Sequence, residues 1–109
     1  MLAASQLPPA LRKNGIAERL ARICQENDVV FLAIFGSFVN GKPHKKSDVD
    51  ILIRYKEGTK KTLFDLVELG YKLRRVFGRK VDLVEVGGLT NKYIREEVLS
   101  SIKVIYEEG

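Results

Sequence analysis

The sequence is poor in the residues that build disulfide-linked, metal-cysteine and membrane-spanning proteins. It holds one cysteine, Cys24, and one histidine among 109 residues, so neither a disulfide nor a cysteine or histidine metal cluster can form within the chain. No run of about 18 apolar residues occurs, which excludes a membrane-spanning helix. Residues 1–9 lack the charged start and apolar block of a signal peptide. We therefore expect a cytoplasmic protein without membrane contact.

The composition that remains is that of an ordinary folded domain. Hydrophobic residues make up 45% of the chain and charged residues 30%. The length fits one domain over residues 1–109, of which we expect 1–8 to be flexible. The formal net charge of +5 suits an acidic partner such as a nucleotide, a nucleic acid or an acidic protein, without choosing among them.

The spacing of apolar residues predicts alternating helices and strands, which is typical of an α/β or α+β fold. Asn27-Asp28 and Gly87-Gly88 are expected breaks between elements. In chain order, we expect a helix over 10–26, strands over 29–35 and 48–53, a helix over 62–77, a strand over 81–86, a helix from 90 or 91 to 102, and a strand over 103–106.

The predicted helix over 62–77 carries clear signals at both ends. Thr62 and Asp65 resemble a capping box with Asp in place of Glu, and Gly78 is a suitable residue to end the helix. We expect its apolar residues to form one face toward the core. That face comprises Leu63, Leu66, Val67, Gly70, Leu73 and Phe77.

The stretch from Gly36 to Asp50 is the most informative part of the sequence. Gly36-Ser37 lies between an apolar strand and a short helix, where backbone N–H groups can bind an anion; the alternative is an ordinary turn with Ser37 as helix cap. Asp48 and Asp50 are two residues apart at the next strand, so their side chains share a face. Two adjacent carboxylates repel unless a proton or cation lies between them, and Mg²⁺ prefers such oxygen ligands.

Asp82 is a third carboxylate, placed at the second residue of the predicted strand over 81–86. Taken alone, it fits an exposed strand end or an ion pair with Arg79 or Lys80. Together with Asp48 and Asp50, it completes a set that can hold two metal ions about 4 Å apart. In that arrangement, Asp82 binds only the ion at the attacking hydroxyl group and can accept the proton of that group.

The loop between the two strands is basic. Lys42, Lys45 and Lys46 can contact a triphosphate or can simply be a solvated loop, and both readings stay open. Ser47 is expected to cap the turn or to orient Asp48. We include Lys46 and Ser47 with Gly36 and Ser37 in the predicted nucleotide-binding set.

The spacing of these residues resembles that of the nucleotidyltransferase superfamily related to DNA polymerase β. Gly36-Ser37 is followed by ten residues and then by Asp48-Val49-Asp50, with Asp82 on a later strand. The short chain and Ser47 resemble the minimal nucleotidyltransferases in particular. The sequence departs from the pattern at residues 38–40, where relatives often carry an arginine.

The resemblance implies a palm-like fold: a small mixed β-sheet with helices packed mainly on one face. It also implies Asp48, Asp50 and Asp82 as catalytic residues that bind Mg²⁺, two ions being expected, and ATP or another NTP as substrate. Many minimal nucleotidyltransferases are antitoxins paired with a helical HEPN-domain toxin, and some transfer AMP from ATP to that toxin. We therefore expect such a partner, in a possible hetero-oligomer.

Three functions remain open from the sequence. The first is Mg²⁺-dependent transfer of a nucleotide, with AMP as the leading choice, to a hydroxyl group of a partner protein. The alternative is a non-catalytic antitoxin that neutralises a partner by direct contact. A third and weaker hypothesis is nucleic-acid binding, which the scattered positions of the lysines argue against.

Overall fold

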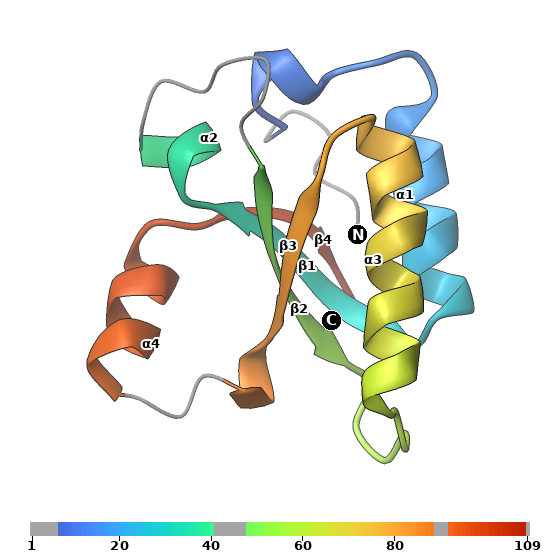
Figure 1. The fold of residues 1–109 in the computed structure, drawn as a ribbon, viewed down its shortest axis with the longest axis vertical. Helices are drawn as coiled ribbons and strands as arrows, with labels where there is room; N and C mark the ends of the chain where they lie inside the picture. The colour runs from blue at the N-terminus through green and yellow to red at the C-terminus, as the bar shows by residue number, and fades with distance from the viewer. Residues whose placement is uncertain (1–6, 41–47, 89–91, 109) are drawn as a thin grey trace.

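The computed structural model describes residues 7–40, 48–88 and 92–108, which form a mixed four-stranded sheet with flanking helices (Figure 1). The strands are β1 (Val29–Phe35), β2 (Val49–Tyr55), β3 (Val81–Glu85) and β4 (Lys103–Glu107). Their order across the sheet is β3-β2-β1-β4. β1 pairs with β2 and β4 in antiparallel fashion, whereas β2 and β3 are parallel. The predicted mixed sheet is confirmed.

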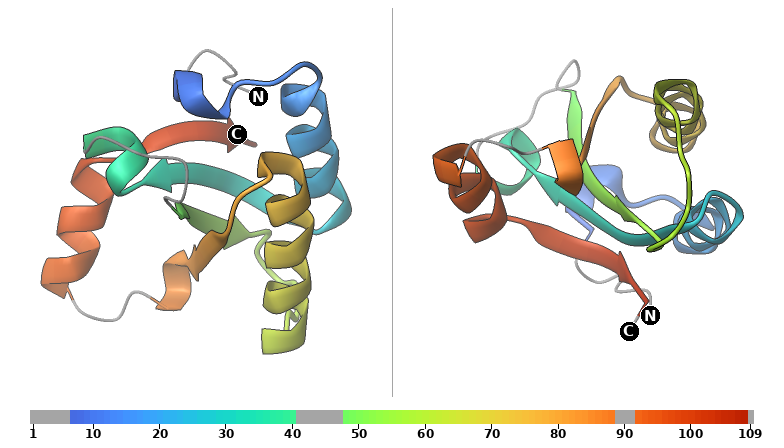
Figure 2. Two further views of the ribbon diagram at one scale, coloured as in Figure 1. Left: turned by 45° about the horizontal axis from the view of Figure 1, so that its top comes forward. Right: turned by 90° about the horizontal axis from the view of Figure 1, so that it is seen from below.

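The two longest helices cover one face of this sheet. The helical segments are η2 (Pro9–Leu11), α1 (Ile16–Glu26), α2 (Ser37–Asn40), α3 (Leu63–Phe77), η3 (Val86–Gly88) and α4 (Lys92–Ser100). α1 and α3 lie side by side against the sheet, whereas α2 and α4 lie on its other side (Figures 1 and 2). This arrangement confirms the palm-like fold. In the described ranges, no helix is long and apolar enough to cross a membrane.

The side chains of β2 point alternately to the two faces of the sheet, which separates the core residues from the acidic ones. Val49, Ile51 and Ile53 are fully buried in a cluster that includes Leu20 of α1 and Leu73 of α3. Because side chains alternate along a strand, Asp50 lies on the opposite face from these three residues. The packing that holds the sheet against the helices therefore also fixes the face on which the acidic residues stand.

The first helix begins later than predicted. Gly15, at φ 73°, precedes α1, so the predicted helix over 10–26 is wrong in its first turns and the α-helix begins at Ile16. A glycine is favoured there because this backbone conformation disfavours a side chain. Leu7, which lies in the segment expected to be flexible, is buried in the core.

α3 has the predicted ends but a different buried face. Thr62 and Asp65 form a reciprocal capping box, and Gly78 ends the helix at φ 66°. The buried residues of the helix are Leu69, Leu73, Val76 and Phe77. Leu63 and Val67, both expected in the core, are 74% and 50% exposed. The helix packs on α1 and on the edge strand β3, which leaves the stripe that begins at Leu63 beyond the edge of the sheet.

Candidate active site

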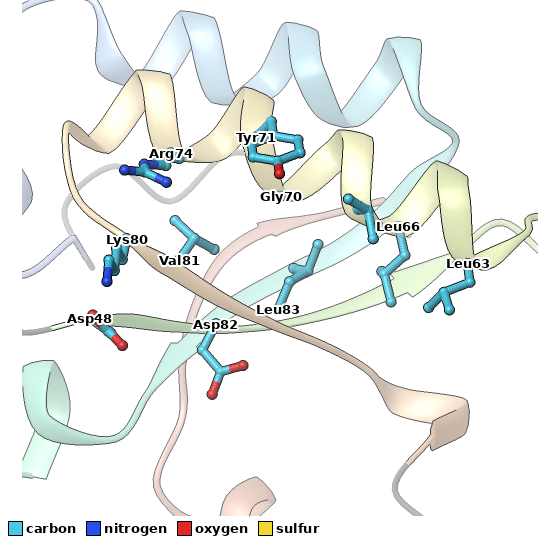
Figure 3. Close-up of a pocket in the computed structure, with 11 residues that line it drawn as sticks. Asp48, Leu63, Leu66, Gly70, Tyr71, Arg74, Lys80, Val81, Asp82 and Leu83 are labelled. Carbon is cyan, nitrogen blue, oxygen red and sulfur yellow. The ribbon is translucent and has the colours of Figure 1, made fainter.

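Strand pairing places two of the acidic residues opposite each other. Asp50 of β2 lies directly opposite Asp82 of β3 in the parallel register, so both side chains share one face of the sheet. Asp48 lies one residue before β2. Figure 3 shows the carboxyl groups of Asp48 and Asp82 on the side of the sheet away from α3.

Asp50 is affected both by burial and by the charges of the two other aspartates. Its side chain is half-buried, whereas Asp48 and Asp82 are exposed. Burial raises the pKa of Asp50, and the charges of Asp82 and Asp48 raise that pKa further. Within the described ranges, the two ion pairs given by the structure, Lys61 with Asp28 and Lys72 with Glu68, involve none of the three. The ion pair of Asp82 with Lys80, weighed as an alternative, is absent from this part of the chain.

Gly36 lies against the carboxyl group of Asp50. It follows Phe35, the residue that pairs with Asp50 across β1 and β2. A Cβ atom at position 36 would overlap with Oδ2 of Asp50 and lie 3.0 Å from its Cγ. The backbone there also has a φ of 76°, and the carbonyl oxygen of Gly36 accepts a 3.0 Å hydrogen bond from the N–H of Val39. Glycine is therefore needed both for the conformation and for the space.

The donor set fits a hard divalent cation in its chemistry. It consists of carboxylate oxygens, and a cation among them would offset the repulsion that raises the pKa of Asp50. Over residues 7–40, 48–88 and 92–108, no three acidic, histidine or cysteine side chains are already gathered into a ligand cluster. The assignment of Asp48, Asp50 and Asp82 as metal ligands therefore remains a prediction.

The predicted nucleotide-binding residues are covered only in part by the structure. Ser37 is the first residue of α2, directly after Gly36. Lys46 and Ser47 lie outside the described residues. The sequence did not predict the contact of Arg79 with α2, in which the guanidinium carbon lies 5.1 Å from the ring centroid of Phe38. No sequence signal connects Arg79 to α2, because the contact joins segments that are far apart in the chain.

Sequence reasoning also missed a groove between α3 and β3. It has a volume of about 520 Å³ and opens beside Asp48 and Asp82. Figure 3 shows Leu63 and Leu66 toward one end and Arg74 and Lys80 toward the other. The lining residues are Asp48, Leu63, Leu66, Val67, Gly70, Tyr71, Arg74, Lys80, Val81, Asp82 and Leu83.

Comparison with known proteins adds a family match over most of the chain. Residues 17–107 match the model of the nucleotidyltransferase domain. A candidate protein adenylyltransferase of Methanocaldococcus jannaschii is 32% identical over 87 residues, which cover 80% of this chain and 90% of that protein.

Solved structures with similar folds include a candidate minimal nucleotidyltransferase, 34% identical at a TM-score of 0.64, over 79% of this chain and 87% of the other. A toxin–antitoxin structure with AMP-PNP has a TM-score of 0.68 at 22% identity, over 84% and 73% of the two chains. A complex of a tri-AMPylated HEPN toxin with an MNT antitoxin from Shewanella oneidensis has a TM-score of 0.59 at 18% identity, over 84% and 69%. At these identities, the last two similarities show a shared fold only.

Proposed function

Because the chain belongs to the nucleotidyltransferase domain family, we propose that it transfers AMP from ATP to a hydroxyl group of a partner protein. The observation that carries the proposal is that Gly36, which follows β1, lies against Asp50 of β2, and that Asp50 pairs with Asp82 of β3. The choice of AMP as the transferred group is supported by the relative that is named a candidate protein adenylyltransferase.

In the proposed reaction, the acceptor oxygen attacks the α-phosphorus of ATP. The bond from that phosphorus to the oxygen bridging to the β-phosphate breaks, and pyrophosphate leaves with the electron pair. The proton of the hydroxyl group passes to the carboxylate of Asp82, which is exposed on the edge strand and accessible to an acceptor.

The other residues of the site hold the nucleotide. Asp48, Asp50 and Asp82 would bind Mg²⁺ in two positions. Bound Mg²⁺ would neutralise the phosphate charge and lower the pKa of the attacking hydroxyl group. Gly36 lets the backbone approach Asp50, so that N–H groups at the start of α2 can face the triphosphate. Lys46 and Ser47 belong to the same nucleotide-binding set.

For the partner, we propose a helical HEPN-type toxin that is inactivated by the modification, so that the chain acts as an antitoxin. The support is the fold shared with the MNT antitoxin in complex with a tri-AMPylated HEPN toxin.

The test is transfer of label from α-³²P-labelled ATP to a partner protein in an extract of the source cells. We expect the wild-type protein with Mg²⁺ to label a partner, and the double variant Asp48→Asn with Asp50→Asn to lower that labelling by about 100-fold or more. Glu18→Gln, on the exposed surface of α1, serves as control. Equal labelling by the double variant would refute the proposal. If the double variant labels nothing but still neutralises the partner, the contact-only antitoxin is the correct function.

A further inference from the structure

The groove between α3 and β3 has an apolar wall that nothing in the described part of the chain covers. Leu63, Val67 and Tyr71 follow one another at intervals of four residues and are 74%, 50% and 58% exposed. Residues spaced in this way lie on one face of a helix. A contiguous exposed apolar surface of this kind marks a site of interaction with another molecule.

The groove lies on the acceptor side of the proposed site. Gly36 follows β1, Asp50 is on β2 and Asp82 is on β3, so the three residues form a row across the sheet. The proposed triphosphate position is at the β1 end of that row, beside Gly36. The groove opens at the β3 end, where Asp48 and Asp82 border it. The groove lies on the α3 side of β3, whereas the carboxyl group of Asp82 is on the other face of this edge strand (Figure 3). A partner seated in the groove therefore extends around the edge of β3 to bring its hydroxyl group to Asp82.

The exposure of the wall favours a protein over a small ligand. A site for a small molecule buries most of its ligand in a closed cleft. Here the side chains of Leu63, Val67 and Tyr71 remain half or more exposed. A surface this open leaves a small ligand largely in water, whereas the apolar side chains of a protein partner can cover it.

The charge of the groove specifies the partner further. Arg74 and Lys80 lie at one end (Figure 3) and form no ion pair within the part of the chain that the structure describes. Two free cations beside an apolar stripe match a surface that combines apolar side chains with a carboxylate.

We propose that this groove is the docking site of the acceptor protein, which contacts Leu63, Val67 and Tyr71 with apolar side chains and Arg74 and Lys80 with an acidic group. The proposal rests on the proposed function, because it assigns the surface that presents the acceptor hydroxyl group to Asp82. Docking of the acceptor protein in the groove orients its hydroxyl group for the reaction. The groove itself has no role in nucleotide binding.

The experiment measures labelling of the partner in the extract together with binding of Mg-ATP by the purified protein. Val67→Arg and Arg74→Glu are each expected to slow labelling by about tenfold at limiting extract. Both should keep the thermal stabilisation by Mg-ATP, because neither residue belongs to the proposed nucleotide site.

Two matched controls are available in the chain. Arg75 is adjacent to Arg74 on α3 but borders a different surface with Arg19 and Arg22. Leu99, on α4, is another exposed apolar residue, at 39%. Arg75→Glu and Leu99→Arg should therefore label the partner within about twofold of the wild-type rate.

Cross-linking tests the contact directly. Cysteine introduced by Val67→Cys should cross-link to the labelled partner through a thiol–amine reagent, whereas Leu99→Cys should not. The native Cys24 is buried and does not interfere.

Several results would overturn the docking proposal. Groove variants that label the partner at the wild-type rate refute it, as does equal cross-linking from positions 67 and 99. Loss of Mg-ATP stabilisation in Val67→Arg would make the groove a nucleotide subsite. A wild-type dimer that Val67→Arg converts to monomers in sedimentation, with labelling unchanged, would make the occupant a second copy. If the wild-type protein labels no protein, the proposed function itself fails.

Discussion

At the scale of single residues, Gly36 has the most demanding environment in the proposed site. Its positive φ is shared with Gly15, but of the glycines that the structure describes only Gly36 and Gly78 have a side-chain atom within 3.0 Å of an added Cβ, and at Gly78 it is the end of the flexible Lys13 side chain, at 3.0 Å. At Gly36 that atom is Oδ2 of Asp50, one of the proposed metal ligands. The effect of the backbone conformation and the effect of the lost space can therefore be separated by experiment.

We expect Gly36→Ala to lower AMP transfer by about 100-fold, because the methyl group displaces the carboxyl group of Asp50. Gly15→Ala is the control, since the space around its Cβ is open to 4 Å and only the backbone strain, about 1 kcal/mol, is added. The measurements are labelling of the partner and the free energy of unfolding in urea. Wild-type labelling by Gly36→Ala would show that the position of Asp50 does not matter.

The raised pKa of Asp50 predicts a dependence of stability on pH in the absence of divalent cations. Between the usual aspartate pKa of 3.8 and the raised one, the folded state holds more protons than the unfolded state. The contribution of Asp50 to the free energy of unfolding therefore falls as the pH rises through this window. The Asp50→Asn variant should not show this decrease in the free energy of unfolding.

Thermal melts in EDTA from about pH 4 to pH 7 test this expectation. The wild-type protein should lose stability relative to Asp50→Asn as the pH rises. Mg²⁺ at roughly 100 times its Kd should restore about 2.7 kcal/mol to the wild-type protein at neutral pH. Parallel pH profiles for the two proteins would contradict the predicted shift.

At the scale of elements, α3 joins the core to the groove. One stripe of the helix, including Leu69 and Leu73, is buried against the core, and the neighbouring stripe from Leu63 to Tyr71 faces the groove. The first turn, which contains Leu63, is held by the capping box of Thr62 and Asp65. The backbone N–H of Thr62 donates a 2.8 Å hydrogen bond to Oδ2 of Asp65.

We expect Thr62→Ala to lower the free energy of unfolding by about 1 kcal/mol through loss of the cap. Thr59→Ala is the control, because Thr59 donates to the carbonyl of Lys56 in the preceding loop and caps no helix. The hydrogen bonds from Thr62 lower the pKa of Asp65. The stability that the cap provides is therefore complete above the usual aspartate pKa and is lost as the pH falls through the lowered one. Urea unfolding at neutral pH and in acid measures both effects.

The order of elements could be predicted from the sequence, whereas the orientation of α3 could not. Hydrophobic spacing located β1 to β4 because each apolar run is long enough to be distinctive. The same spacing assigned Leu63 and Val67 to the core, because a periodic pattern does not show how far the sheet extends beneath a helix. The structure ends the sheet at β3, and the groove results from that edge.

The candidate site, too, could be predicted from the sequence only in part. The positions of Asp48 and Asp50 on one face follow from their spacing of two residues. The alignment of Asp82 with Asp50 depends on the parallel register of β2 and β3, which no local pattern fixes. The overlap of a Cβ at Gly36 with Asp50 is likewise a contact across two strands. Lys46 and Ser47 lie outside the described residues, so their proposed role stays a prediction.

At the scale of the whole molecule, the single cysteine is enclosed by the core. Cys24 has no exposed surface, and burial raises its pKa to about 12, with a smaller contribution from the charge of Glu108. The thiol is therefore protonated and inaccessible at neutral pH. Its reactivity should report opening of the entire domain.

We expect Cys24 to react with Ellman's reagent only at the rate at which the protein unfolds. Increasing urea should speed the reaction in step with the unfolded fraction. Glu18→Cys, at an exposed position of the same helix, should react at once. Rapid reaction of Cys24 in native buffer would show that α1 separates from the sheet without unfolding of the rest.

The parallel pairing of β2 with β3 has a consequence for the synthesis of the protein. A parallel connection needs an intervening segment, and here that segment includes the 15 residues of α3. During translation, Gly36 and Asp50 leave the ribosome well before Asp82. A nascent chain that has not yet presented β3 lacks the last carboxylate, so the enzyme should gain its activity only when the second half of the domain has been made and has folded.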